Sequence, residues 1–108
     1  MTVNQLVEKL GAYALSLPDG EKIVRGCYAG DLLSRVMSKA HRGNVWVTIM
    51  SNINVPAVAT ISDLSCVIIA ENPCPDEEVI AVARARGINI LLMNESTYEI
   101  CVKLSQLL

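Results

Sequence analysis

The chain has 108 residues, a formal charge of −2 and 52% hydrophobic residues, and it contains no Phe. A chain of this size fits one domain with a packed core. Its nine basic and eleven acidic residues form no basic stripe. We therefore expect no nucleic-acid partner, because such partners need a basic surface and aromatic side chains for base stacking.

The first eleven residues, MTVNQLVEKLG, lack the basic stretch and apolar core of a signal peptide. No apolar run approaches the roughly 20 residues that cross a bilayer. We therefore expect a cytoplasmic protein with no membrane partner.

The four cysteines are widely spaced and form no C-x-x-C pair, and the chain has one histidine. They are Cys27, Cys66, Cys74 and Cys101. This spacing predicts no metal site and no cofactor. In a reducing compartment the cysteines act as small apolar residues.

The first elements in chain order are a helix and one or two short strands. Thr2 to Gln5 match a capping box, and the apolar residues that follow at helical spacing predict a helix that Gly11 ends. Ala12–Leu17 is ambiguous, and a short strand before the turn at Pro18 is one interpretation. Lys22–Tyr28 is typical of a strand.

Asp31 is predicted to be the N-cap of the helix that starts at Leu32, and the cationic and glycine residues His41-Arg42-Gly43 are predicted to close it. Val45–Met50 is almost wholly apolar and β-branched, which predicts a strand buried on both faces.

Asn54 is predicted to cap a helix over residues 55–61 with Pro56 in its first turn, and an extended conformation stays open as the alternative. Cys66–Ala70 reads as a second buried strand.

The last forty residues contain a helix, a strand and a helix. Pro75 and the three acidic residues after it predict a helix start, and Gly87 predicts its end. Ile88–Met93 is a strand, and Ser96 to Glu99 form a second capping box before the last helix. Strands that alternate with helices predict a single α/β domain with a mainly parallel sheet flanked by helices. The inner strands are then Val45–Met50, Cys66–Ala70 and Ile88–Met93.

Ligands of open parallel sheets bind beyond the carboxyl ends of the strands. The segments predicted to meet there are Ala29 to Asp31, Ser51 to Asn54, Glu71 to Cys74, and Asn94 to Thr97. The candidate ligand-binding residues at this edge are Gly30, Asp31, Ser51, Asn52 and Asn54. A purely structural role remains open, because Asn, Ser and Asp are also ordinary turn and cap residues.

The sequence contains no enzyme motif. It has no phosphate loop, no G-x-G-x-x-G and no nucleophile elbow, and His41 is the only histidine that could serve as a base. We therefore predict no catalytic activity.

Four stretches, GCYAGDLLSRVM, VTIMSNINVPAVA, DLSCVIIAEN and PDEEVIAVARARGINILL, resemble the DRTGG domain family over residues 5–107. The resemblance implies a fold similar to the amino-terminal domain of HPr kinase and a regulatory or structural module without established catalysis. Members of the family occur beside CBS domains and in some pyrophosphatases. The chain has no Asp-Arg-Thr-Gly-Gly run, and residues 51–54 match the family's polar stretch only in position.

We therefore predict a stand-alone regulatory or interaction module that binds a small nucleotide- or anion-like ligand or a protein partner. The alternative is a structural dimerisation or scaffold subunit of a larger metabolic complex. The apolar surplus and the Leu107-Leu108 end of the last helix predict a homodimer.

Overall fold

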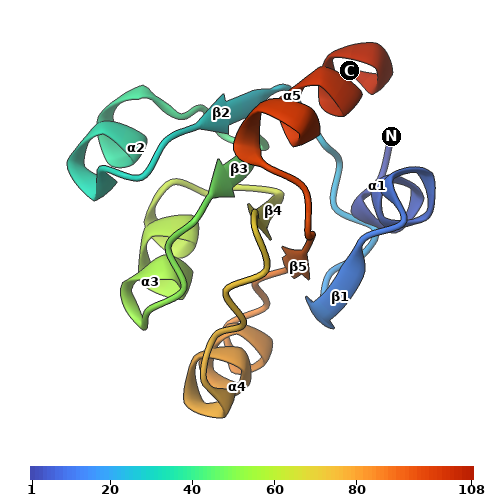
Figure 1. Ribbon diagram of the computed structural model, residues 1–108. Helices are drawn as coiled ribbons and strands as arrows, with labels where there is room; N and C mark the ends of the chain where they lie inside the picture. Colours follow the sequence, from blue (N-terminus) through green and yellow to red (C-terminus); the bar gives the residue numbers. More distant parts are fainter.

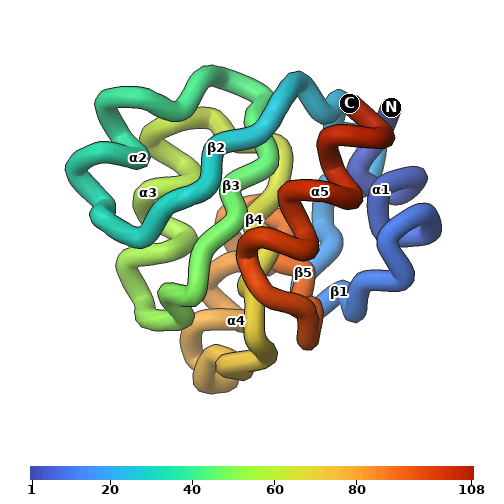
Figure 2. Tube along the Cα trace, turned by 45° about the horizontal axis from the view of Figure 1, so that its top comes forward, coloured from blue at the N-terminus to red at the C-terminus, as the bar shows by residue number.

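The computed structural model describes residues 1–108, which form five strands and five helices. Figure 1 shows a central sheet with helices on both sides, and the two ends of the chain lie close together in both views (Figures 1 and 2). The elements in chain order are α1 (Val3–Leu10), β1 (Tyr13–Ser16), β2 (Cys27–Ala29), α2 (Leu33–Lys39), β3 (Val45–Thr48), α3 (Asn54–Ile61), β4 (Cys66–Ile69), α4 (Glu77–Ala85), β5 (Ile90–Leu92) and α5 (Thr97–Leu107).

The strands follow the order β1-β5-β4-β3-β2. The pairs β2–β3, β3–β4 and β4–β5 are parallel, and only β1 is antiparallel, beside β5. The predicted α/β architecture with three inner parallel strands is therefore confirmed. Each of these strands is one to three residues shorter than the apolar run that predicted it.

Alternate residues of the inner strands divide the core into two layers, as the pleat of a strand requires. Val45 and Val47 of β3 pack with α1 and α5, whereas Trp46 points into the layer formed by α2, α3 and α4. Both faces of the inner strands are covered, so the strands are apolar without alternation. Each fully buried aliphatic side chain of this kind stabilises the fold by roughly 1.5–3 kcal/mol.

The ambiguous segment Ala12–Leu17 contains the antiparallel edge strand β1. A buried polar network fixes its end against β5. The Ser16 hydroxyl donates to the Ile88 carbonyl at 2.7 Å, and the Asn89 amide donates to the carbonyls of Asp19 and Ser65 at 2.8 and 3.0 Å.

The strand predicted over Lys22–Tyr28 is wrong over residues 22–26, because β2 begins only at Cys27. Residues 22–25 run beside the amino terminus instead, where Val3 N donates to the Lys22 carbonyl at 3.0 Å and Val24 N donates to the Met1 carbonyl at 2.9 Å. Gly26 then takes φ +73°, a left-handed conformation that turns the chain into the sheet. The local sequence pattern does not indicate that this segment pairs with the amino terminus.

Both predicted capping boxes are present. Thr2 caps α1 and Ser96 caps α5, each with its reciprocal Gln5 or Glu99 contact. Residues 55–61 are helical, which settles the open alternative. Helix α4 begins directly after Asp76, as the run of acidic residues predicts.

Candidate functional site

The carboxyl ends of β2 and β3 are joined through Asp31. Its Oδ1 accepts hydrogen bonds from the Thr48 hydroxyl at 2.7 Å and from the Ile49 backbone N–H at 2.9 Å. One residue earlier, Gly30 N donates to the Val47 carbonyl at 3.0 Å. Gly30 and Asp31 therefore lie beside the end of β3, just before the segment that begins at Ser51.

The prediction that Asp31 caps α2 is wrong. The helix begins at Leu33, its N-cap position is Leu32, and no side chain bonds to its first turn. The Asp31 carboxylate binds to Thr48 and Ile49 instead, so it links two strand ends rather than starting a helix.

The predicted N-cap role of Asn54 is also wrong, because Asn54 is the first residue of α3. Asn52 shapes this turn. Its side-chain Oδ1 accepts from Asn54 N at 2.9 Å, and its carbonyl accepts from Val55 N at 3.1 Å. Since Pro56 has no N–H, the first turn of α3 is satisfied by Asn52 alone.

The loop between β3 and α3 leaves backbone donors free. The N–H groups of Ser51, Asn52 and Ile53 donate no hydrogen bond within the chain. Consecutive free N–H groups in a turn can form a concave site for an anion. This loop is therefore the part of the edge best suited to a phosphate or carboxylate group.

Exposed apolar side chains flank these polar groups. Leu32 is 65% exposed, and Ile49 and Ile53 are each 45% exposed. Sequence reasoning missed all three, together with Thr48. The available signal was their position, since each adjoins Asp31, the end of β3 or the asparagine turn.

The other two segments predicted at this edge meet each other. Glu71 N donates to the Glu95 carbonyl at 2.9 Å, and Asn72 N donates to the Met93 carbonyl at 3.1 Å. The end of β4 reaches β3 as well, because Ala70 N donates to the Thr48 carbonyl at 2.8 Å. All four predicted segments therefore lie along one edge of the sheet.

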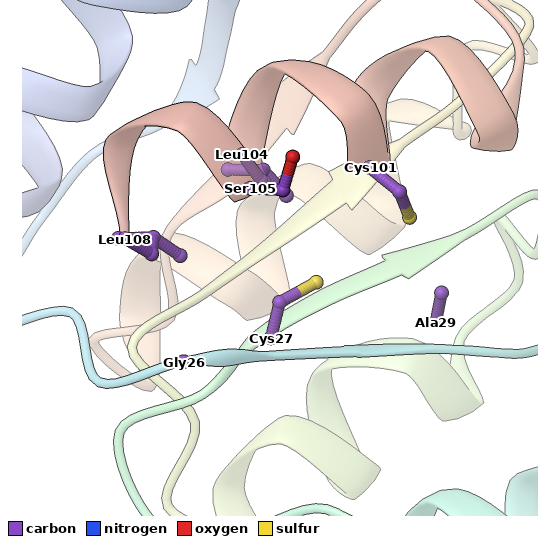
Figure 3. Close-up of a pocket in the computed structure, with 7 residues that line it drawn as sticks. All are labelled: Gly26, Cys27, Ala29, Cys101, Leu104, Ser105 and Leu108. Carbon is purple, nitrogen blue, oxygen red and sulfur yellow. The ribbon is translucent and has the colours of Figure 1, made fainter.

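The structure has three cavities, and none is lined by the five candidate residues. The carboxyl edge near Asp31 is thus an open surface. A cavity of about 290 Å³ lies instead between β2 and α5 (Figure 3). Its lining residues are Gly26, Cys27, Ala29, Cys101, Leu104, Ser105 and Leu108.

Two thiols face each other in this cavity. Figure 3 shows the Cys27 sulfur pointing toward α5 and the Cys101 sulfur pointing toward β2. Desolvation of the Cys27 thiol, with a smaller effect of the neighbouring Cys101, raises the pKa of Cys27 to about 12. Burial likewise raises the pKa of Cys66 to about 12. A thiol with so high a pKa is a poor nucleophile at neutral pH.

No group of three or more His, Cys, Asp or Glu side chains is arranged to hold a metal ion. None of the helices has the length and apolar character needed to cross a membrane.

No known family profile matches the chain, and no curated protein sequence matches it. A solved structure does match. It is the regulatory region of Clostridium perfringens pyrophosphatase, which consists of CBS and DRTGG domains and was crystallised with its activator, diadenosine tetraphosphate. The TM-score is 0.75 at 12% sequence identity, and the match covers 97% of this chain and 46% of that one.

The match establishes the fold. The chain is an α/β domain with a DRTGG-like fold, as its sequence resemblance predicts. It spans about half the length of the regulatory region to which it is similar.

Proposed function

We propose that this chain is a non-catalytic regulatory module that binds a small nucleotide- or anion-like ligand at the carboxyl edge of its sheet. The observation that carries the proposal is the free N–H row of residues 51–53, in the loop that follows the strand end bound by Asp31. Gly30, Asp31, Ser51, Asn52 and Asn54 form or shape this surface.

Each part of the surface fits a different part of a nucleotide. The N–H groups of Ser51 to Ile53 suit a phosphate oxygen. Asp31 uses only Oδ1 for Thr48 and Ile49, so its Oδ2 is free to accept from a ribose hydroxyl. The exposed side chains of Leu32 and Ile53 offer an apolar surface to the base.

The fold likeness supports the same ligand class. The similar regulatory region of the pyrophosphatase binds diadenosine tetraphosphate as its activator. A dinucleotide of that kind carries the phosphate, hydroxyl and base groups that this edge is suited to contact.

The proposed module binds its ligand without catalysing a reaction on it. Asp31 is the only ionisable side chain among the residues of this surface, and the single histidine, His41, lies exposed in another loop after α2. No base and nucleophile are paired here, which fits sensing rather than turnover.

A thermal-unfolding series with diadenosine tetraphosphate, ATP, AMP and inorganic phosphate tests the proposal. A ligand at a hundred times its dissociation constant stabilises the native state by roughly 2.7 kcal/mol, which raises the melting temperature by about 10 degrees in a domain of this size. We expect at least one nucleotide to produce such a shift.

Ser51→Glu locates the site, because its added negative charge lies beside the free N–H groups and repels a phosphate. Ser38→Glu is the matched control, since Ser38 is an exposed serine near the carboxyl end of α2. We expect Ser51→Glu to abolish the shift and Ser38→Glu to retain it. Equal shifts in both variants would place the ligand elsewhere, and no shift with any nucleotide in the unsubstituted chain would reject the ligand.

The second candidate function is that of a structural dimerisation subunit. The observation that favours it is the uncharged surface of α5 beside the edge strand β2, where Tyr98 is 77% exposed and Leu108 is 46% exposed. We propose that the chain is a homodimer, whether or not it also binds a ligand. Light scattering tests this directly, since a dimer has about twice the 11.7 kDa mass of one chain.

A further inference from the structure

Strand β2 has an unpaired outer edge. On its inner side, Val45 N donates to the Gly26 carbonyl at 2.9 Å and Gly30 N donates to the Val47 carbonyl at 3.0 Å. Because backbone groups of a strand point alternately to its two sides, the N–H and C=O groups of Cys27 and Ala29 point away from β3. Both residues are exposed, and β2 is the last strand in the sheet.

This edge lacks two of the features that usually prevent strand pairing, although the strand is short at three residues. Exposed edges are commonly protected by charged side chains, proline or a covering element. The sequence of β2 is Cys-Tyr-Ala, which contains neither a charge nor a proline. The small side chain of Ala29 leaves its backbone accessible.

The surface of α5 beside β2 is also uncharged. Cys101, Ser105 and Leu108 line the cavity between the two elements (Figure 3). At helical spacing, Tyr98 and Val102 continue the same surface outward, and they are 77% and 41% exposed. We define the edge of β2 and these five residues, four in α5 and Leu108 directly after it, as the β2–α5 surface.

The charged residues of α5 point in other directions. Lys103 forms an ion pair with Glu95, and Glu99 belongs to the capping box of Ser96. An uncharged apolar surface of this kind beside unpaired backbone groups is typical of a protein interface rather than of a free face.

We propose that the β2–α5 surface is a two-fold interface with a second copy of this chain, in which the two β2 strands pair antiparallel about Tyr28. The inference rests on the proposed homodimer and specifies where its subunits meet.

A second copy of the chain is the inferred partner because the edge of β2 is self-complementary. Centred on Tyr28, antiparallel pairing places Cys27 opposite Ala29 of the partner subunit, and the reverse pair follows by symmetry. Residues opposed in this way exchange both N–H to C=O hydrogen bonds, so each outward group finds a partner. A two-fold interface of this type uses the same surface on both chains.

The same symmetry covers the apolar part of the surface. A two-fold axis perpendicular to the sheet keeps both α5 helices on one face, side by side, above the paired β2 strands. Ser105 is small enough to allow their approach, and Tyr98, Val102 and Leu108 lose contact with water. A stable interface needs roughly 800 Å² from each partner, a modest part of the 5584 Å² surface of one chain.

An isolated peptide would gain less from this site. With only three residues in β2, the ladder offers few hydrogen bonds, and no charge on the surface selects a peptide. The second copy supplies its own apolar helix together with the strand.

The test compares Ser105→Lys with Gln106→Lys by light scattering over a range of micromolar concentrations. Both residues are exposed neighbours on α5 and receive the same charge, but only Ser105 lines the cavity. We expect Ser105→Lys to raise the dimer dissociation constant on the order of 100-fold, because it buries an unpaired charge. Gln106→Lys should dimerise as the unsubstituted chain does.

A second variant, Ala29→Pro, tests the strand pairing itself. It removes an N–H that points away from β3, so the fold tolerates it at this edge and circular dichroism verifies that it does. We expect a folded monomer.

The outcomes separate the two proposals. A mass that stays near 11.7 kDa for the unsubstituted chain overturns the homodimer and this interface together. A dimer that survives both Ser105→Lys and Ala29→Pro overturns only the interface. Equal dissociation of Ser105→Lys and Gln106→Lys also overturns it, since the position of the charge would then not matter.

Discussion

The helices on the two faces of the sheet begin in different ways. On one face, α1 and α5 each start with a complete capping box, in which Thr2 or Ser96 bonds to the backbone three residues later. On the other face, no N-cap side chain bonds to the first turn of α2, α3 or α4. These three helices and α5 each follow a parallel strand, so all four amino termini lie at the carboxyl edge.

The difference shows that a helix start either satisfies its own backbone donors or leaves them open. A capping box satisfies the first N–H groups of a helix with its own sequence and leaves little for a ligand. At the carboxyl edge, Asp31 and Asn52 are used to join strand ends and shape a turn, and the donors of Ser51 to Ile53 stay free. At this same edge, the start of α5 is closed by its capping box, whereas the loop before α3 keeps open donors.

The largest expected effect comes from Trp46, which connects the core of the α2–α4 layer to the candidate site. Its buried indole Nε1–H donates to the Gly30 carbonyl at 2.8 Å. We expect Trp46→Ala to lower the free energy of unfolding by about 3–5 kcal/mol, because it leaves a large cavity. Urea unfolding followed by circular dichroism measures this loss.

Trp46→Phe is the matched variant, since it keeps an aromatic ring and removes the hydrogen bond. We expect a smaller loss of about 1–3 kcal/mol, which is typical when a buried carbonyl loses its donor. If the two variants lose equal stability, the bond to Gly30 rather than the ring volume dominates at this position.

A direct comparison of the two faces comes from their N-caps. We expect Thr2→Ala and Ser96→Ala each to cost about 1 kcal/mol, because each removes a capping hydrogen bond. Asp76→Ala at α4 should cost less than about 0.5 kcal/mol, since the Asp76 side chain makes no cap bond. A loss at Asp76 as large as at Ser96 would contradict the contrast between the faces.

Much of the fold is predictable because its signals are local. The apolar runs around Val47, Ile68 and Leu91 predict the inner strands, and the capping boxes at Thr2 and Ser96 place two helix starts correctly. In each case, residues close in sequence determine the element, so the local sequence pattern is enough to predict it.

Apart from the local error at Asn54, the errors occur where residues distant in sequence compete. Asp31 is a good N-cap by type, yet it binds Thr48 and Ile49, which lie 17 and 18 residues away. Residues 22–25 have strand character but pair with the amino terminus. No local pattern reports such contacts.

The position of the candidate segments could be predicted from the sequence, but their detailed geometry could not. The rule that ligands bind beyond the ends of parallel strands places Gly30 and Ser51 at one edge, and their segments do meet there through Asp31 and Ile49. The free N–H groups of Ser51 to Ile53 depend on how the loop folds, and the exposure of Leu32 depends on where α2 begins. Ligand binding by these residues stays a prediction.

The smallest expected effect is a pH dependence at the edge opposite the candidate site. Asp63 accepts from Lys22 at 2.8 Å and also pairs with Arg42 at 2.8 Å. The hydrogen bond from Lys22, aided by both positive charges, lowers the pKa of Asp63 below its usual value of 3.8. A carboxyl with a depressed native pKa adds stability above its unfolded pKa and loses it as the pH falls through the native value.

The contribution is therefore present at neutral pH, begins to decline near pH 4 and is lost as the pH falls through the depressed native pKa of Asp63. Because the Asp63 side chain is 46% exposed, we expect it to be less than about 1 kcal/mol and to shrink in high salt. Asp63→Asn is the appropriate variant, since Asp63 has φ +49° and Asn tolerates this left-handed conformation. The free energy of unfolding, measured in urea from pH 7 to pH 2.5, should fall less steeply for Asp63→Asn than for the unsubstituted chain. Parallel curves of this free energy against pH would show that the two ion pairs contribute nothing.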